Sequence, residues 1–197
     1  VERKQLARTI QRSIDDRRRG ARALNPRPFA LVVIVCAAHM LTLIGIFAFP
    51  ALLPTFVSEW SLSNAEAGWI SGVPLAANAI TVSILVSLTD RVDARYIFCA
   101  GTSLCAISLV GFALFAEGFW SAMAFRALGG IAMAASYMPG LRMLVDRYHG
   151  PRQSRAVSLY TASFSLGTAA SFLVAGEVGA AFGWQMAFWI SAAAAVV

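Results

Sequence analysis

The chain has 197 residues, of which 58% are hydrophobic and 13% are charged, with a formal net charge of +6 and a mean hydropathy of +0.68. A soluble domain of this size carries about a quarter of its residues as charged side chains. The composition therefore excludes a soluble globular protein and predicts a membrane protein.

Residues 1–28 form a basic segment before the first apolar stretch. Leu6, Ile10 and Ile14 recur every four residues among the cations, a pattern compatible with an interfacial amphipathic helix over residues 2–19. A nucleic-acid-binding arm and a mitochondrial presequence are alternative interpretations. We favour a cytoplasmic tail attracted to anionic lipid, because polybasic segments commonly flank the first span of membrane proteins.

Six stretches after this tail are long and apolar enough to cross the hydrocarbon core, which takes about 20 residues per helix. They lie at roughly 29–55, 66–89, 96–116, 119–143, 156–176 and 183–197. They lack the period-two alternation of barrel strands. The prediction is an all-α membrane protein, with one six-helix transmembrane bundle over residues 29–197.

The chain begins with Val1, and its last residues stop inside an apolar run. We therefore expect a fragment of a longer protein.

The charged residues between the predicted spans fall on two opposite sides. The side that also holds the basic tail carries the cations: Arg91, Arg95, Arg142, Arg147, Arg152 and Arg155. The other side carries acids without any Lys or Arg: Glu59, Glu66, Glu117 and Glu177. Cations resist translocation, so the sequence predicts a cytoplasmic N-terminus. We expect the membrane to be a bacterial inner (plasma) membrane.

Two ionisable side chains lie inside predicted spans. Arg126 is the only Lys, Arg, Asp or Glu in the interior of a predicted span, since Arg142 and Glu66 lie at span ends, and such a residue is a functional candidate by default. It could be a packing and hydrogen-bonding hub, favoured slightly, or a counter-charge for an anionic substrate. His39 lies mid-span and is the only residue there with an ordinary pKa near neutrality. It is a candidate for proton coupling, although a lone histidine more often serves packing.

Other polar or small residues in the spans complete the candidate site. Asn78, Tyr137 and Tyr160, with Thr42, Ser136 and Ser163, could line a solute cavity. Gly129 and Gly130 follow Arg126 on the same span and permit a close approach of another helix.

No catalytic residue, metal site or cofactor is predicted. The three cysteines have no metal-ligand spacing, and no phosphate-binding loop is present. The segment GWISG at 68–72 superficially resembles the nucleophile loop of an intramembrane serine protease. Such an enzyme needs a histidine on a later helix, and the only later histidine is His149, in a predicted loop.

The stretch SLTDRVDARY at 87–96, between the second and third predicted spans, resembles the loop signature of the major facilitator superfamily. Leu88, Asp90, Arg91 and Arg95 match the signature, whereas Val86, Asp93 and Ala94 depart from it.

Three further segments are similar to the same family: FRALGGIAMAA with Arg126 and Gly130 in place, DRYHGPRQSRA, and GWQMAFWI. The overall texture is similar to bacterial cyanate and nitrate permeases. The resemblance implies the N-terminal six-helix half of the family fold, built from two inverted three-helix repeats, with a second half absent.

The resemblance also implies that the loop between the second and third spans is a cytoplasmic conformational latch. Asp90, Arg91 and Arg95 would belong to it. Asp90 ends a helix whose dipole disfavours a carboxylate there, so it needs a cation, and Arg91, Arg95 and Arg142 are the candidates. Asp93 is expected to cap the third span.

The leading functional hypothesis is a secondary active transporter that moves a small solute, a small organic or inorganic anion, by alternating access. Its partners would be the solute, the lipid bilayer, and the missing C-terminal six-helix half or a second copy, with no nucleic acid. A stand-alone six-helix membrane protein acting as a dimer or a non-transporting scaffold is the alternative. An intramembrane serine protease is a remote one.

Overall fold

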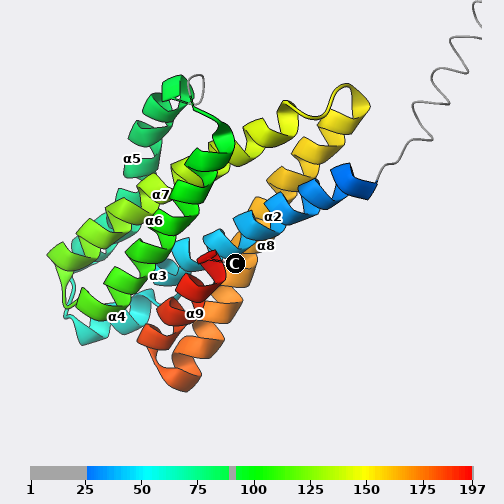
Figure 1. Cartoon of the computed structure of the whole chain (residues 1–197). Helices are drawn as coiled ribbons and strands as arrows, with labels where there is room; N and C mark the ends of the chain where they lie inside the picture. The colour runs from blue at the N-terminus through cyan, green and yellow to red at the C-terminus, as the bar shows by residue number, and fades with distance from the viewer. Residues whose placement is uncertain (1–25, 89–91, 197) are drawn as a thin grey trace, which may run out of the picture.

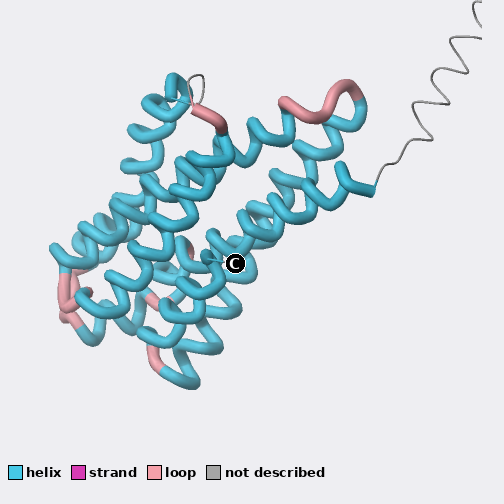
Figure 2. The backbone as a smooth tube through the Cα atoms, viewed as in Figure 1, coloured by secondary structure: helices cyan, strands magenta, loops and turns pink. Residues whose placement is uncertain are grey.

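The computed structural model describes residues 26–88 and 92–196, and the regular structure in these ranges is entirely helical (Figures 1 and 2). The helices are α2 (Pro26–Ile46), α3 (Ala48–Ala51), α4 (Leu53–Glu59), α5 (Asn64–Leu88), α6 (Ala94–Phe115), α7 (Phe119–Val145), α8 (Pro151–Phe182) and α9 (Trp184–Val196). The predicted all-α class is confirmed.

Five of these helices, α2, α5, α6, α7 and α8, contain stretches long and apolar enough to span a membrane. The sixth predicted span corresponds to α9, an apolar helix of only 13 residues. The fifth, predicted at 156–176, is part of the 32-residue helix α8. At 1.5 Å per residue α8 is about 48 Å long, so its ends extend beyond a hydrocarbon core of about 30 Å.

The first predicted span is not one continuous helix, and the prediction of a single element over 29–55 is wrong. The chain turns at Phe47 and again at Leu52, between α2, α3 and α4. Pro50 and Pro54 explain the breaks, because proline has no backbone N–H for the carbonyl four residues earlier.

Helix α7 lies at the centre of one side of the bundle and packs against both α5 and α6 (Figure 1). On the other side α2 runs along α8, and α9 packs against α2, α6 and α8. The two sides are joined by the contact of α6 with α9 and by contacts of α7 with α2 and α8.

The contact of α5 with α7 is backbone on backbone. A Cβ atom placed on Gly130 would overlap the carbonyl group of Pro74. Gly130 therefore permits the close approach that small residues provide in membrane bundles.

An aromatic cluster ties α4 to α6 and α9. The rings of Phe112 and Phe188 stack at 4.3 Å between centroids, and Phe56 meets Trp184 edge-on at 5.1 Å. Trp184 Nε1 also donates a hydrogen bond of 2.8 Å to Glu59 Oε2. The short helix α4 is thus held by α6 and α9, whereas α2 is held mainly by α8.

Candidate functional site within the helical bundle

The most buried cation of the described spans is Arg126, on α7. Its Nη1 donates a hydrogen bond of 2.5 Å to the backbone carbonyl of Ile46, and its guanidinium lies 5.3 Å from the ring centroid of Phe49. The side chain is 5% exposed, and among the described residues no acceptor satisfies its Nε. Arg126 therefore donates one hydrogen bond to the backbone of the first span, while its Nε has no acceptor among the described residues.

The position of Ile46 explains why an external donor is needed there. In a continuous helix the Ile46 carbonyl would accept from the N–H of residue 50, and residue 50 is a proline. The carbonyl would be left without a partner in a buried place, at a cost of about 1–3 kcal/mol. Arg126 replaces the missing helical donor.

Two neighbouring helices hold the same end of α2. Ser171 Oγ of α8 donates to the Ile44 carbonyl at 2.5 Å, and Cys105 Sγ of α6 lies 3.8 Å from the Thr42 carbonyl. Side chains of α6, α7 and α8 thus converge on the last carbonyls of α2. We call this region, residues 42–50 with Cys105, Arg126 and Ser171, the span-one break.

His39 forms a second centre on α2, about one helical turn before the start of the span-one break. It is fully buried, and its ring stacks on Tyr160 at 4.8 Å between centroids, with Tyr137 at 5.3 Å and Phe164 at 6.1 Å. Neither ring nitrogen has a hydrogen-bond partner among the described residues. We call His39, Tyr137, Tyr160 and Phe164 the ring cluster.

The tyrosines of the ring cluster link α7 to α8. The Tyr160 hydroxyl donates to the Tyr137 carbonyl at 3.1 Å and lies 3.4 Å from that of Ser136. Tyr160 is fully buried and Tyr137 is half-buried. The phenol of Tyr160 is therefore satisfied, unlike the imidazole that it covers.

The structure brings His39, Tyr137 and Tyr160 together but separates them from the other candidates. Arg126 precedes Tyr137 by 11 residues on α7, a rise of about 16 Å. Asn78 is half-buried on α5, which packs against α7, and it does not belong to the ring cluster.

Several hydroxyls expected to line a cavity turn inward and bond to their own helices. Thr42 donates to the Ala38 carbonyl, Ser136 to that of Met133, and Ser163 to that of Tyr160. All three are buried.

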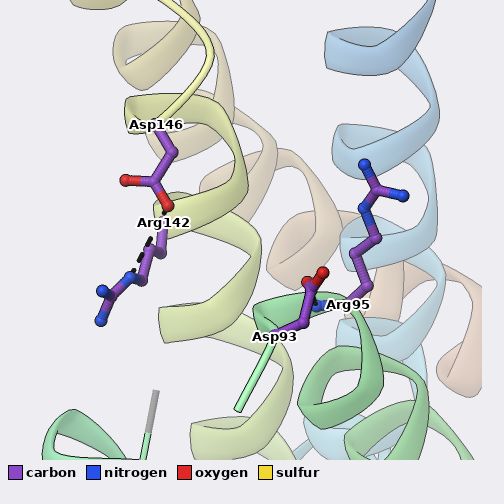
Figure 3. Close-up of polar contacts among 4 residues, drawn as sticks. All are labelled: Asp93, Arg95, Arg142 and Asp146. Carbon is purple, nitrogen blue, oxygen red and sulfur yellow. Dashed lines mark hydrogen bonds and ion pairs between the residues drawn. The ribbon is translucent and has the colours of Figure 1, made fainter. Parts of the chain in front are cut away.

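Figure 3 shows the described charges near the loop between α5 and α6. Asp93 accepts a hydrogen bond of 2.9 Å from the backbone N–H of Arg95, so its expected capping of α6 is confirmed. Arg142 Nε lies 3.7 Å from Asp146 Oδ2, and Asp146 directly follows the end of α7. The side chains of Arg95 and Arg142 point in different directions. Asp90 and Arg91 lie outside the described residues.

The sequence reasoning missed Ser171, Phe49 and Pro50. Pro50 carried the usable signal, because a proline inside an apolar run leaves a carbonyl in need of a donor. Arg126 was singled out, but its acceptor lies 80 positions away in the chain.

The chain is similar in sequence to proteins that are named as transporters. The chain is 28% identical over 153 residues to the niacin transporter NiaP of Acinetobacter baylyi, a match that covers 77% of this chain and 34% of that protein. It is 27% identical over 150 residues to the phosphoglycerate transporter protein of Salmonella typhimurium, covering 73% of this chain and 32% of that protein. A probable sphingolipid transporter, spinster homolog 1 of Arabidopsis thaliana, is 24% identical over 139 residues, covering 71% and 28%.

The chain thus spans about a third of the length of the curated relatives it matches. The family description that matches is that of the Major Facilitator Superfamily, and the match runs over residues 35–197, from the middle of α2 to the end of the chain. It includes every helix that contributes to the span-one break and to the ring cluster, and on this evidence the chain belongs to the Major Facilitator Superfamily.

Proposed function

We propose that this chain is part of a secondary active transporter that moves a small solute, an organic or inorganic anion, across the membrane by alternating access. The observation that carries the proposal is the pair of ionisable side chains inside the bundle. Arg126 and His39 are both buried, and each keeps nitrogen atoms without a partner among the described residues. Such groups are costly at membrane depth and are retained mainly where a solute or an ion uses them.

The absence of acids from the interiors of the spans favours an anion over a cation, because Glu66 and Glu177 lie only near the ends of α5 and α8. Between Glu66 and Asp90, and again between Asp93 and Glu117, the sequence contains no carboxylate. Niacin and phosphoglycerate, named for two of the relatives, are organic acids, whereas the sphingolipid named for a third is a lipid. Because the solutes named for these relatives differ in chemistry, the anion proposal rests on the residues of this chain.

The segmented first span supports alternating access. α2 packs mainly along α8, whereas α4 is attached through the aromatic cluster to α6 and α9. The span-one break lies between these two attachments. A change in the side chains that hold its carbonyls would let the two segments change their relative angle.

We also propose that the N-terminus is cytoplasmic and that the membrane is the bacterial inner membrane. Figure 1 places the start of α6, the end of α7 and the start of α8 at one end of the bundle. Arg95, Arg142 and Arg152 belong to these segments, whereas Glu59, Glu117 and Glu177 belong to segments at the other end. This separation agrees with the tendency of cations to stay on the cytoplasmic side.

A second six-helix half or a second copy of the chain is the proposed protein partner. Gly68, Gly72 and Ala76 follow one another at four-residue intervals on the exposed side of α5, and nothing lies within 4 Å of a Cβ built on either glycine. This spacing suits a close contact between transmembrane helices. A second copy on this face would correspond to the alternative, a stand-alone dimer.

The protease alternative receives no support from the described residues. The Ser71 hydroxyl donates to the Ala67 carbonyl of its own helix at 2.8 Å. His149 is exposed between α7 and α8.

Uptake by the full-length protein in proteoliposomes tests the proposed function. Niacin, phosphoglycerate, nitrate and cyanate would be offered alongside cationic and neutral solutes, with and without a pH gradient, and empty liposomes are the control. We expect saturable uptake of at least one anion. Uptake of cationic or neutral solutes without any anion would contradict the anion proposal, and no uptake at all would favour the scaffold alternative.

A further inference from the structure

One side of α8 is exposed along most of the length of the helix. Its residues recur at intervals of three or four, which places them on one face. In chain order they are Arg155, Leu159, Ala162, Leu166, Ala169, Leu173 and Glu177, all exposed. We call this set the outer face of α8. Its three leucines are 50%, 59% and 69% exposed, so no other described helix covers them.

The outer face is apolar over a length that matches a bilayer. Arg155 and Glu177 are 22 positions apart, a rise of about 33 Å along the helix, and the hydrocarbon core is about 30 Å thick. Between these two residues α8 contains no charged side chain. Charges are costly inside the core, so the outer face carries one charge at each boundary of the hydrocarbon.

The outer face differs in composition from the exposed side of α5. There Gly68, Gly72 and Ala76 leave room for the close approach of another helix. The outer face contains no glycine, and its leucines project at every second turn. Contact of leucine with another helix gains little over contact with acyl chains, because both surroundings are equally apolar. The outer face is therefore better matched to lipid than to a packed helix.

The boundary at Arg155 lies in a strongly basic part of the chain. Arg152 is exposed one turn earlier on α8, and Arg147 is exposed in the turn that precedes the helix. Asp146 is the only acid among residues 118–176. The cations at this boundary therefore outnumber the acids and favour a negatively charged lipid head group.

We propose that the outer face of α8 binds an anionic phospholipid, whose phosphate lies against Arg152 and Arg155. Guanidinium groups pair with phosphate through charge-assisted hydrogen bonds. The acyl chain would lie along Leu159 and Leu166, since Leu166 is about 16 Å of helix rise from Arg155, half of the hydrocarbon thickness.

The opposite boundary gives the site its direction. Glu177 repels an anionic head group, so the site takes its lipid from one leaflet, which is the cytoplasmic leaflet in the proposed orientation. The inference concerns the lipid and not the solute, and it goes beyond the proposed transport function.

The test is the quenching of a fluorescent label by lipid in the full-length protein. Every cysteine would first be replaced, including Cys36, Cys99 and Cys105. Leu159→Cys and Leu166→Cys would then be labelled with bimane, one at a time, in phosphatidylcholine vesicles. Increasing fractions of phosphatidylglycerol or phosphatidylcholine with a nitroxide on the acyl chain would be added, because the nitroxide quenches the label on contact.

We expect both lipids to quench both labels, and phosphatidylglycerol to quench at the lower fraction. Arg155→Gln should lower this preference about fivefold, because a cation near an anionic membrane surface contributes about that factor. Arg147→Gln is the matched control, since Arg147 is exposed but does not belong to α8. It should leave the preference unchanged.

Three results would overturn the inference. Equal quenching by the two lipids would show general contact with the bilayer and no site for an anionic lipid. Equal losses in Arg147→Gln and Arg155→Gln would assign the preference to the basic loop as a whole. Absence of quenching by either lipid would mean that water or a helix of another bundle covers the leucines.

The quenching readout does not require a known solute. A preference for phosphatidylglycerol in a protein that takes up no solute would keep the lipid site and reject the proposed function. Uptake of an anion without this preference would do the reverse.

Discussion

Arg126 donates a hydrogen bond to the backbone carbonyl of Ile46, and that carbonyl lacks its helical donor because residue 50 is proline. Arg126 thus supplies the hydrogen bond that Pro50, 76 positions earlier in the chain, cannot donate. The guanidinium also lies over the ring of Phe49, so its charge is partly compensated by the aromatic face.

The first prediction concerns this pair. Arg126→Leu leaves the Ile46 carbonyl unpaired, and we expect a loss of about 1–3 kcal/mol, visible as a lower Tm of the full-length protein in detergent. Pro50→Ala restores an N–H at residue 50, so Pro50→Ala/Arg126→Leu should regain much of this loss. An additive double variant would show that the hydrogen bond is not the stabilising element.

The same variants separate the two roles of Arg126. Arg126→Ala is expected to abolish uptake of an anionic solute while membrane insertion stays intact. If uptake returns together with Tm in Pro50→Ala/Arg126→Leu, Arg126 is a hydrogen-bonding hub. If Tm returns without uptake, Arg126 serves as the counter-charge.

The second prediction uses the contrast between His39 and Tyr160. His39→Phe keeps a ring in the cluster and removes two buried nitrogens that have no partner among the described residues, so Tm should be unchanged or higher. Tyr160→Phe keeps the ring and removes a hydroxyl bonded to the Tyr137 carbonyl, so it should cost about 1 kcal/mol. Thermal unfolding of both variants measures whether each substitution raises or lowers Tm.

Uptake then tells whether His39 has more than a packing role. If it takes part in coupling, His39→Phe should lose uptake driven by a pH gradient without any loss of Tm. A fully active His39→Phe variant would assign His39 to packing alone.

The third prediction compares two glycines on neighbouring helices. Gly130→Ala places a methyl group against the backbone of Pro74, which cannot move aside, and overpacking of this kind costs about 1–3 kcal/mol. Gly72→Ala meets open space and adds helix propensity, worth up to about 1 kcal/mol. We expect Tm to fall in the first variant and to stay or rise in the second.

Equal losses in the two variants would have a different cause. They would mean that Gly72 is also closely packed in the assembled protein, as the proposed second bundle or second copy requires. Loss of that partner in crosslinking of Gly72→Ala would support this explanation.

The class of the fold was predictable from the sequence because hydropathy alone decides it. About 20 apolar residues without charge can only form a helix in lipid, and the positions of α5, α6 and α7 followed within a few residues. The breaks at Phe47 and Leu52 were not predicted, because window hydropathy ignores the missing N–H groups of Pro50 and Pro54.

The candidate site was predictable only in part. Arg126 and His39 stand out because ionisable side chains are rare in apolar spans. Which of the hydroxyls turn inward depends on the rotation of each helix about its axis, and the hydrophobic periodicity of these spans is too weak to fix it. Ser163 was therefore expected to line a cavity, whereas the structure buries it and exposes Ser165.

The last prediction concerns the proposed cytoplasmic latch. Arg142 and Asp146 lie 3.7 Å apart, with side chains that are 39% and 62% exposed. An exposed pair of this kind contributes under about 1 kcal/mol, so neither Arg142→Gln nor Asp146→Asn should change Tm measurably.

If Arg142 is the latch partner of Asp90, Arg142→Gln and Asp90→Asn should both lower the uptake rate, and combining them should add little. Asp146→Asn should leave uptake unchanged, because it removes only the local partner of Arg142 at the end of α7. The charge-reversed pair Asp90→Arg/Arg142→Asp should recover uptake relative to either single reversal, since the attraction is restored with opposite polarity. Recovery by Asp146→Arg/Arg142→Asp instead would assign the function of Arg142 to its own helix and remove it from the latch.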